Sequence, residues 1–275
     1  MEQNQDERQM LLARRANERR PSTLLSKVPQ VTLAFWIVKI LATTVGETGG
    51  DALSMSLQLG YAVSSLIFLV FFAITLTAQV RSRRYHPFVY WAVVIATTTV
   101  GTTMSDYLDR TVGLGYVKSS ILLLCGVLAI LFAWYRVAGV IQFENISTNR
   151  DEVFYWMTIL VSNTLGTALG DFAADDTGLG LGFEKGALLF SGLLALVVLA
   201  HSLTNIRSSL LFWSAYILTR PLGATLGDTL TKSHEEGGFE LNRIIASLTI
   251  LALMVVGIVL SSRRAKHFPV PRQRV

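Results

Sequence analysis

The chain has 275 residues, of which 51% are hydrophobic and only 16% are charged, and its mean hydropathy is +0.47. A soluble domain carries roughly a quarter charged residues, so this composition excludes an ordinary soluble protein and indicates an integral membrane protein. The net charge of +5 does not favour a nucleic-acid partner, because the basic residues gather in tails and short connections without an aromatic-basic surface module.

Eight apolar runs follow one another along the chain, each close to the roughly 20 residues that cross a bilayer as a helix. They cover residues 31–50, 61–80, 88–106, 117–140, 153–171, 186–206, 208–228 and 244–262. The runs are continuous rather than strictly alternating, so a helical bundle is expected and not a β-barrel. The predicted fold class is an all-α integral membrane protein with eight transmembrane helices.

The segments that flank the apolar runs are polarised in charge. Residues 1–29 form a basic tail without the apolar stretch of a signal peptide, and residues 263–275 form a second basic tail. Cations also recur in every second connection, and by the positive-inside rule these connections and both termini face the cytoplasm. The remaining connections are acidic, so the membrane domain, residues 30–262, is expected to be basic inside and acidic outside.

One pattern of sixteen residues occurs four times: a tryptophan, a glycine ten positions later and an aspartate five positions after that. The copies are Trp36–Gly46–Asp51, Trp91–Gly101–Asp106, Trp156–Gly166–Asp171 and Trp213–Gly223–Asp228. An apolar run follows each aspartate, so the repeating unit is a helical hairpin with an acidic connection, over residues 30–80, 87–140, 152–206 and 208–262. Because each unit contains two spans, all units share one orientation. We therefore expect their first helices to surround a common axis with fourfold or twofold pseudosymmetry.

Polar side chains line one face of each first helix. Positions seven, eleven and fifteen after the tryptophan lie one helical turn apart, and positions eight and twelve lie beside them. The candidates for lining a path are Thr43, Thr48, Thr98, Thr102, Asn163, Thr167 and Thr225. Lipid disfavours such a face, so we expect these side chains to point into the bundle.

Five carboxylates are the candidate ligands of a metal ion. They are Asp51, Asp106, Asp171, Asp228 and Glu47. Carboxylates are costly near hydrocarbon, so the equivalent placement of the four aspartates favours one shared cation site. Oxygen donors suit hard divalent cations, with Mn²⁺ favoured and Ca²⁺ or Mg²⁺ next, and the ion is expected as substrate without any further cofactor. The alternative is that the aspartates cap short outer helices such as residues 52–57.

Three charges lie deeper in the apolar runs than the aspartates: Lys39, Glu47 and Arg220. In one interpretation Glu47 forms a structural ion pair with Lys39 or Arg220. In the other, Glu47 is a proton-coupling group, and Lys39 and Arg220 are charge partners along the path. The glycines beside the polar face have two compatible roles, which are close helix packing and local unwinding that exposes carbonyl oxygens.

Over nearly the whole membrane portion the chain resembles a family of bacterial multi-pass proteins described as uncharacterised membrane-anchored proteins. The residues that carry the resemblance are Lys27-Val28-Pro29-Gln30-Val31-Thr32 and Gly46-Glu47-Thr48-Gly49-Gly50-Asp51. It implies a multi-pass protein of the bacterial cytoplasmic (inner) membrane and supplies no activity. The segment from Glu47 to Asp51 is also similar to the Glu-x-Gly-Asp signature of exchangers that export Ca²⁺ or Mn²⁺ against protons. The spacing differs by one residue, and Ala52 stands where those proteins have a basic residue.

These features together predict a membrane transporter of a divalent cation, with Mn²⁺ favoured, working in export and coupled to protons. Two alternatives stay open: a carrier or channel for a small organic or anionic solute, and a structural or sensory membrane scaffold. An enzyme is not expected, because the sequence has no Ser-His-Asp set, His-rich metal motif or Walker loop. The predicted partners are the lipid bilayer and the transported ion or solute, without nucleic acid, and assembly into a homo-oligomer is left open.

Overall fold

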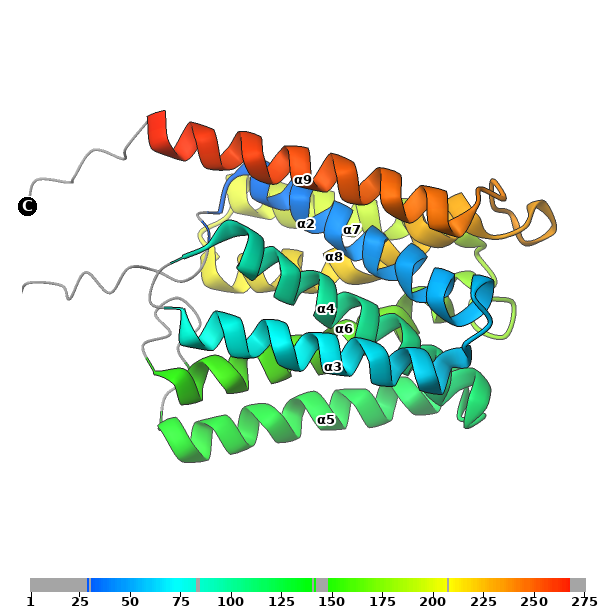
Figure 1. Cartoon of the computed structure of the whole chain (residues 1–275), viewed down its shortest axis with the longest axis horizontal. Coiled ribbons are helices and arrows are strands. Elements are labelled where there is room, and N and C mark those ends of the chain that lie inside the picture. Colours follow the sequence, from blue (N-terminus) through cyan, green and yellow to red (C-terminus); the bar gives the residue numbers. More distant parts are fainter. Residues whose placement is uncertain are drawn as a thin grey trace, which may run out of the picture.

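A computed structural model of the chain describes residue 29 and residues 31–82, 85–139, 141, 148–206 and 208–267. Within these residues the fold is all-α, and eight long helices run side by side (Figure 1). They are α2 (Leu33–Asp51), α3 (Gly60–Arg81), α4 (Pro87–Asp106), α5 (Gly115–Ala138), α6 (Asn149–Ala174), α7 (Phe183–Leu203), α8 (Ser208–Thr231) and α9 (Arg243–His267). Each corresponds to one predicted apolar run. The first predicted basic tail lies outside the described residues except for residue 29, and of the second only residues 263–267 are described, as the end of α9.

Local sequence sets several of the helix ends. The hydroxyl of Thr32 accepts a hydrogen bond from the amide of Phe35 at the start of α2, at 3.3 Å. α4 begins at Pro87. Amides in the first turn of a helix have no acceptor within the helix, so the missing amide hydrogen of proline costs no hydrogen bond there. Short π-helical turns, η1 (Ala52–Ser56) and η2 (Tyr107–Thr111), continue α2 and α4, and a 3-10 turn, η3 (His234–Glu236), follows α8.

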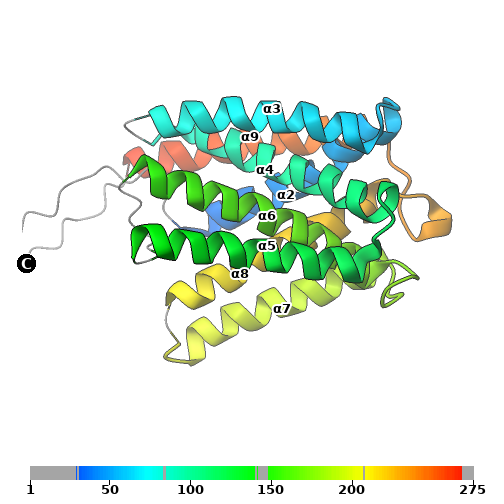
Figure 2. The same cartoon turned by 90° about the horizontal axis from the view of Figure 1, so that it is seen from below.

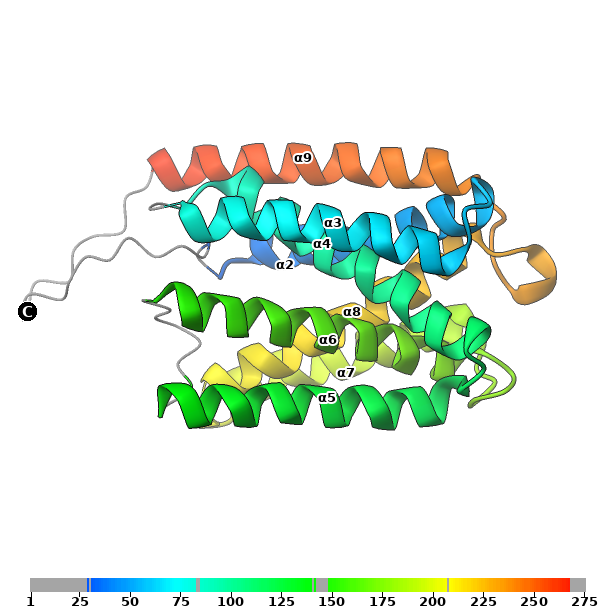
Figure 3. The same cartoon turned by 60° about the horizontal axis from the view of Figure 1, so that its bottom comes forward.

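The first helices of the four repeats form a closed ring. α2 packs on α4, α4 on α6, α6 on α8, and α8 on α2. These four cross in the middle of the bundle, with the other four helices around them (Figures 2 and 3). The first helices thus surround a common axis as the shared orientation of the repeats predicts, and of the two predicted arrangements the closed ring of four similar contacts is the fourfold one. The connections that follow the aspartates all lie at one end, on the right in Figure 1.

The second helix of each repeat packs mainly on the first helix of the following repeat. α3 lies on α4, α5 on α6 and α7 on α8, and α9 completes the cycle by lying on α2. The two helices of one repeat contact each other much less, so each repeat is a pair of connected helices whose main packing partners belong to the neighbouring repeats. Each repeat therefore needs its neighbours to bury its polar face, as in other repeat proteins.

Five of the described helices are long and apolar enough to cross a membrane, judged by length and composition. They are α3, α4 with the turn that follows it, α5, α7 and α9. The other three helices, α2, α6 and α8, belong to the inner ring and carry polar faces that the ring encloses. These helices are compatible with a multi-pass membrane protein in which four of the five apolar helices lie outside and α4 belongs to the inner ring with the three more polar helices.

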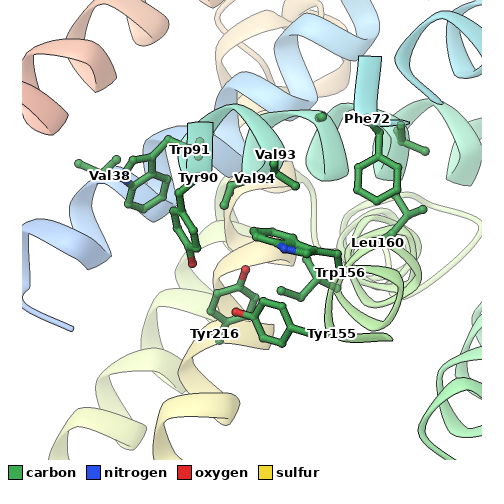
Figure 4. Close-up of a cluster of buried hydrophobic side chains, with 14 of the residues drawn as sticks. Val38, Phe72, Tyr90, Trp91, Val93, Val94, Tyr155, Trp156, Leu160 and Tyr216 are labelled. Carbon is green, nitrogen blue, oxygen red and sulfur yellow. The ribbon is translucent and has the colours of Figure 1, made fainter. Parts of the chain in front are cut away.

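Aromatic side chains close the end of the inner ring that contains the repeat tryptophans. Each tryptophan is preceded by an aromatic residue, and that residue contacts the tryptophan of the following repeat. The pairs are Phe35–Trp91 at 5.6 Å, Tyr90–Trp156 at 5.5 Å, Tyr155–Trp213 at 6.0 Å and Phe212–Trp36 at 5.5 Å between ring centroids. We call these eight residues the aromatic collar. Tyr216 of α8 packs against it, close to Tyr155 and Trp156 in Figure 4.

Candidate functional site

The glycine ten positions after each tryptophan sets how closely neighbouring inner helices approach. Each of these glycines faces position seven of the following repeat. The pairs are Gly46 with Thr98, Gly101 with Asn163, Gly166 with Arg220, and Gly223 with Thr43. A Cβ added to Gly166 would lie only 2.6 Å from Cγ of Arg220, closer than side chains tolerate. The packing role predicted for the glycines is therefore confirmed at position ten.

Three of the four residues at position seven bond to the preceding helix of the ring. Thr43 donates to the carbonyl of Thr219 at 3.0 Å, and Thr98 donates to the carbonyl of Ala42 at 3.2 Å. In the third repeat the amide of Asn163 donates to the hydroxyl of Thr97 at 3.0 Å. These predicted path-lining residues thus hold adjacent inner helices together. The fourth residue at this position is Arg220, which behaves differently.

A buried ion pair occupies the centre of the ring, one turn further along. Arg220 is 1% exposed and Glu47 is 3% exposed, and both terminal nitrogens of the guanidinium lie 3.1 Å from Oε2 of Glu47. Arg220 also donates to the hydroxyls of Thr102, at 2.6 Å, and Thr167, while Thr102 donates to Glu47 at 3.1 Å. The fourth residue at position eleven is Ala224, which is buried and has no polar side chain to contribute. All four inner helices therefore contribute to this centre.

Of the two cations predicted as partners of Glu47, the structure pairs it with Arg220 and not with Lys39. A role of Glu47 in proton coupling stays a prediction. Burying two ions costs several kcal/mol each, and good geometry with additional hydrogen bonds offsets that cost. Glu47 obtains both from Arg220 and Thr102. Lys39 does not take part: it is 0% exposed, and its Nζ lies 4.2 Å from the ring centre of Tyr216 and makes no hydrogen bond within the described residues.

The four repeat aspartates lie inside helices and are all buried. α2 and α4 continue beyond Asp51 and Asp106 as the turns η1 and η2, and neither aspartate makes a side-chain capping hydrogen bond. α6 and α8 run beyond Asp171 and Asp228 without a break. The alternative that these aspartates cap short outer helices is therefore wrong, because the helical backbone satisfies its own amides through these positions.

A lysine of the fourth repeat joins two of the aspartates. Nζ of Lys232 lies 3.3 Å from Asp228, on the same helix, and 3.4 Å from Asp51, on the next inner helix of the ring. Arg243, at the start of α9, adds a second cation 3.6 Å from Asp51. These contacts stabilise the buried carboxylates and link three helices at the acidic end.

An arginine of the second repeat serves one aspartate only. Nε of Arg110 lies 3.1 Å from Asp106, one turn earlier on the same helix. Asp171 is 4% exposed, and its carboxylate has neither an ion pair nor a hydrogen bond among the residues that the structure describes. The sequence analysis missed Arg110 and Lys232, although both follow their aspartate by four residues, the spacing of a helical ion pair.

A pocket of 360 Å³ opens at the acidic end of the inner ring. Its lining residues are Asp109, Arg110, Gly115, Tyr116, Asp175, Thr177, Phe183, Lys232 and Glu236. Burial raises the pKa of Asp175, but hydrogen bonds from Thr177 and Tyr116 outweigh burial and hold the pKa below its usual value. The hydroxyl of Ser233 likewise lowers the pKa of Glu236. Both carboxylates therefore remain charged at the mouth of the pocket.

The five candidate ligands are not gathered into a coordination site within the described residues. No group of three or more Asp, Glu, His or Cys side chains is placed to hold a metal ion within the described part of the chain. Four of the five carboxylates are instead held by the protein's own cations. Their part in ion binding stays a prediction.

A known protein family matches the chain: the family described as Repeat of Unknown Function (DUF347). Its repeat matches four segments, residues 34–85, 89–139, 154–207 and 211–267. The four matched segments contain the four copies of the tryptophan, glycine and aspartate pattern and cover more than half of the chain. The chain belongs to the DUF347 repeat family. This agrees with the resemblance to uncharacterised multi-pass proteins, whereas the similarity of residues 47–51 to cation exchangers finds no support. No curated protein and no solved structure matches the chain.

The DUF347 fold separates the predicted path residues into two groups. Those at positions seven and eleven face the ring interior, as described above. The two at position twelve face outer helices instead: Thr48 accepts a hydrogen bond from Ser247 of α9 at 2.9 Å, and Thr225 lies against Gly186 of α7. A step of one residue rotates a side chain by about 100° around a helix, which explains why these two threonines miss the axis.

Proposed function

We propose that this DUF347 protein is a membrane transporter that moves a divalent cation along the axis of its inner helices. One observation carries the proposal: five carboxylates are buried along that axis, inside a ring that apolar helices surround. Ionisable groups at membrane depth are expensive and typically mark the path of an ion or substrate. Carboxylate and hydroxyl oxygens favour Mn²⁺ first, then Ca²⁺ or Mg²⁺.

All eight helices span the membrane in this proposal. α2, α6 and α8 run alongside the five apolar helices and turn their polar side chains toward one another, so their low hydropathy does not require contact with water. The positive-inside rule places both chain ends in the cytoplasm. The pocket and the repeat aspartates then lie toward the outside. Export and proton coupling stay predictions from the sequence.

When no substrate is bound, basic side chains of the protein would neutralise the carboxylates that bind the ion. Lys232, Arg243 and Arg110 neutralise aspartates at the outer end, and Arg220 neutralises Glu47 at the centre. A divalent ion that enters would displace the cations of the outer end first and Arg220 afterwards. At each step the carboxylates would keep a positive charge nearby, which they need in a medium of low dielectric constant. Arg220 must leave the axis for an ion to pass, because it contacts three neighbouring helices there.

Transport by purified protein in liposomes tests the proposal directly. Wild-type protein should carry Mn²⁺ to a dye trapped inside, and Asp228→Asn and Glu47→Gln should slow the transport by about tenfold or more, since each removes a ligand on the path. Asp151→Asn is the control, because Asp151 bonds the indole of Trp134 at 3.0 Å at the opposite end of the bundle. Wild-type protein that moves none of Mn²⁺, Ca²⁺ and Mg²⁺ would reject the proposal.

A carrier of a small organic solute is the second candidate function. The pocket, at 360 Å³, lies within the range of about 300–1,000 Å³ typical of small-molecule sites. Tyr116 and Phe183 offer apolar surface there beside the cations Arg110 and Lys232. A panel of amino acids and carboxylic acids in the same liposomes separates this candidate from metal transport.

A further inference from the structure

Two cations occupy equivalent positions in the repeats but behave differently. Arg110 and Lys232 both follow their tryptophan by nineteen residues and their aspartate by four. Lys232 bridges the aspartate of its own repeat and that of the next repeat around the ring, Asp51. The same symmetry step would take Arg110 from Asp106 to Asp171, because α6 follows α4 as α2 follows α8. Arg110 makes only the first of these contacts.

The side chain of Arg110 turns away from the axis. It is 36% exposed, against 6% for Lys232, and its Nη1 donates to the hydroxyl of Tyr61 at 3.4 Å. Asp171 is left buried without a partner, although the charge of Arg110 still acts on it. The ionised form of a buried carboxylate without a counter-ion is strongly unfavourable, so this position favours uptake of a positive charge, either a proton or a cation.

The pocket provides a way to this position. Arg110 lines the pocket, and so does Asp175, which lies one helical turn beyond Asp171 at the end of α6. A cation that enters the pocket therefore meets Arg110 before it reaches Asp171. The charge of this pair determines which cation fits: when both are ionised, Asp106 and Asp171 carry two negative charges, which a divalent ion neutralises and Arg110 alone does not.

We propose that Asp106 and Asp171 form the first binding site for a divalent cation, and that Arg110 is a tethered cation that competes for it. The inference rests on the proposed function and adds the place of entry and its gate. In the structure Arg110 holds Asp106 while Asp171 is open. An arriving ion binds Asp171 first, then binds Asp106 and displaces Arg110 into the pocket. Water molecules complete the oxygen coordination of the ion.

Equilibrium binding of Mn²⁺ to the full-length protein in detergent tests this competition. Asp171→Asn should weaken binding by about tenfold or more, because it removes a ligand. Arg110→Gln should tighten binding by about tenfold, because it removes the competing charge, whereas Arg110→Lys should stay near wild type. A purely structural role would weaken binding in both neutral variants, so the opposite signs are diagnostic. Glu236→Gln is the matched control, since it removes a pocket charge while glutamine can keep the capping box with Ser233.

The outcomes separate this inference from the proposed function. If the wild type binds and transports Mn²⁺ but Asp171→Asn binds with unchanged affinity, the entry site is wrong and the transporter stands. If the wild type neither binds nor transports a divalent cation, both fall. Should Asp171→Asn fail to fold, Arg110→Gln decides alone, and unchanged or weaker binding in that variant overturns the gate.

Discussion

The two ends of the inner ring follow different rules. At the end with the aromatic collar, all four repeats make the same contact, and the ring-centroid distances fall between 5.5 and 6.0 Å. At the acidic end, the four aspartates stand at one equivalent position but have different surroundings: Asp51 has two cations, Asp106 and Asp228 have one each, and Asp171 has none among the described residues. Symmetry is therefore kept where the repeats pack and lost where they carry charge.

The difference follows from the range of the two interactions. Packing acts over a few ångströms, so four copies of one contact do not disturb one another. Charges act over longer distances, and four copies of one ion around an axis would repel strongly in a medium of low dielectric constant. The centre of the ring accordingly holds one glutamate, one arginine and two threonines.

Removing the central arginine should have the largest effect on the charged region. Arg220→Met leaves Glu47 buried without a counter-ion, and loss of one partner of a buried pair costs about 3–5 kcal/mol of unfolding free energy. Unfolding of the purified protein in detergent, followed by tryptophan fluorescence, measures the loss. The double variant Glu47→Gln with Arg220→Met removes both charges and should recover most of it. No recovery in the double variant would mean that Arg220 acts through packing and not through its charge.

Overpacking a contact between two inner helices should cause the next largest loss of unfolding free energy. Gly223→Ala would push a methyl group into Thr43, and overpacking of this kind costs about 1–3 kcal/mol. The same unfolding experiment measures it. Gly192→Ala in α7 is the matched control, because an added Cβ there meets nothing within 4 Å. Equal losses at both glycines would contradict the closely packed crossing.

The smallest loss of unfolding free energy is expected for substitutions in the aromatic collar. Comparing equivalent positions there tests whether the repeats contribute equally. Phe35→Leu and Phe212→Leu each remove one aromatic contact with the tryptophan of the next repeat, worth about 0.5–1.5 kcal/mol beyond the buried area. Because the two positions are equivalent, the two losses should be similar in the same unfolding assay. A large loss at one position and none at the other would show that the collar is not symmetric in energy.

Much of the fold could be predicted because its signals are local. Each of the eight helices coincides with an apolar run, and the spacing from Trp36 to Asp51 places the polar residues on one face. Two further signals were present and were not used: the aromatic residue before each of the four repeat tryptophans, and the cation four residues after Asp106 and after Asp228. Both repeat along the chain and were therefore available to sequence analysis.

The sequence by itself determined the helices, their repetition and the inward direction of most polar residues of the inner helices, because these depend on spacing within one segment; Thr48 and Thr225 are the exceptions. Only the tertiary structure decided that each outer helix packs on the following repeat, and which charges meet. Glu47 and Arg220 are 173 residues apart, and their contact depends on the order of helices around the ring and on their relative heights. Periodicity fixes the direction of a side chain but not its partner, so the open carboxylate at Asp171 emerges only when the ring is closed.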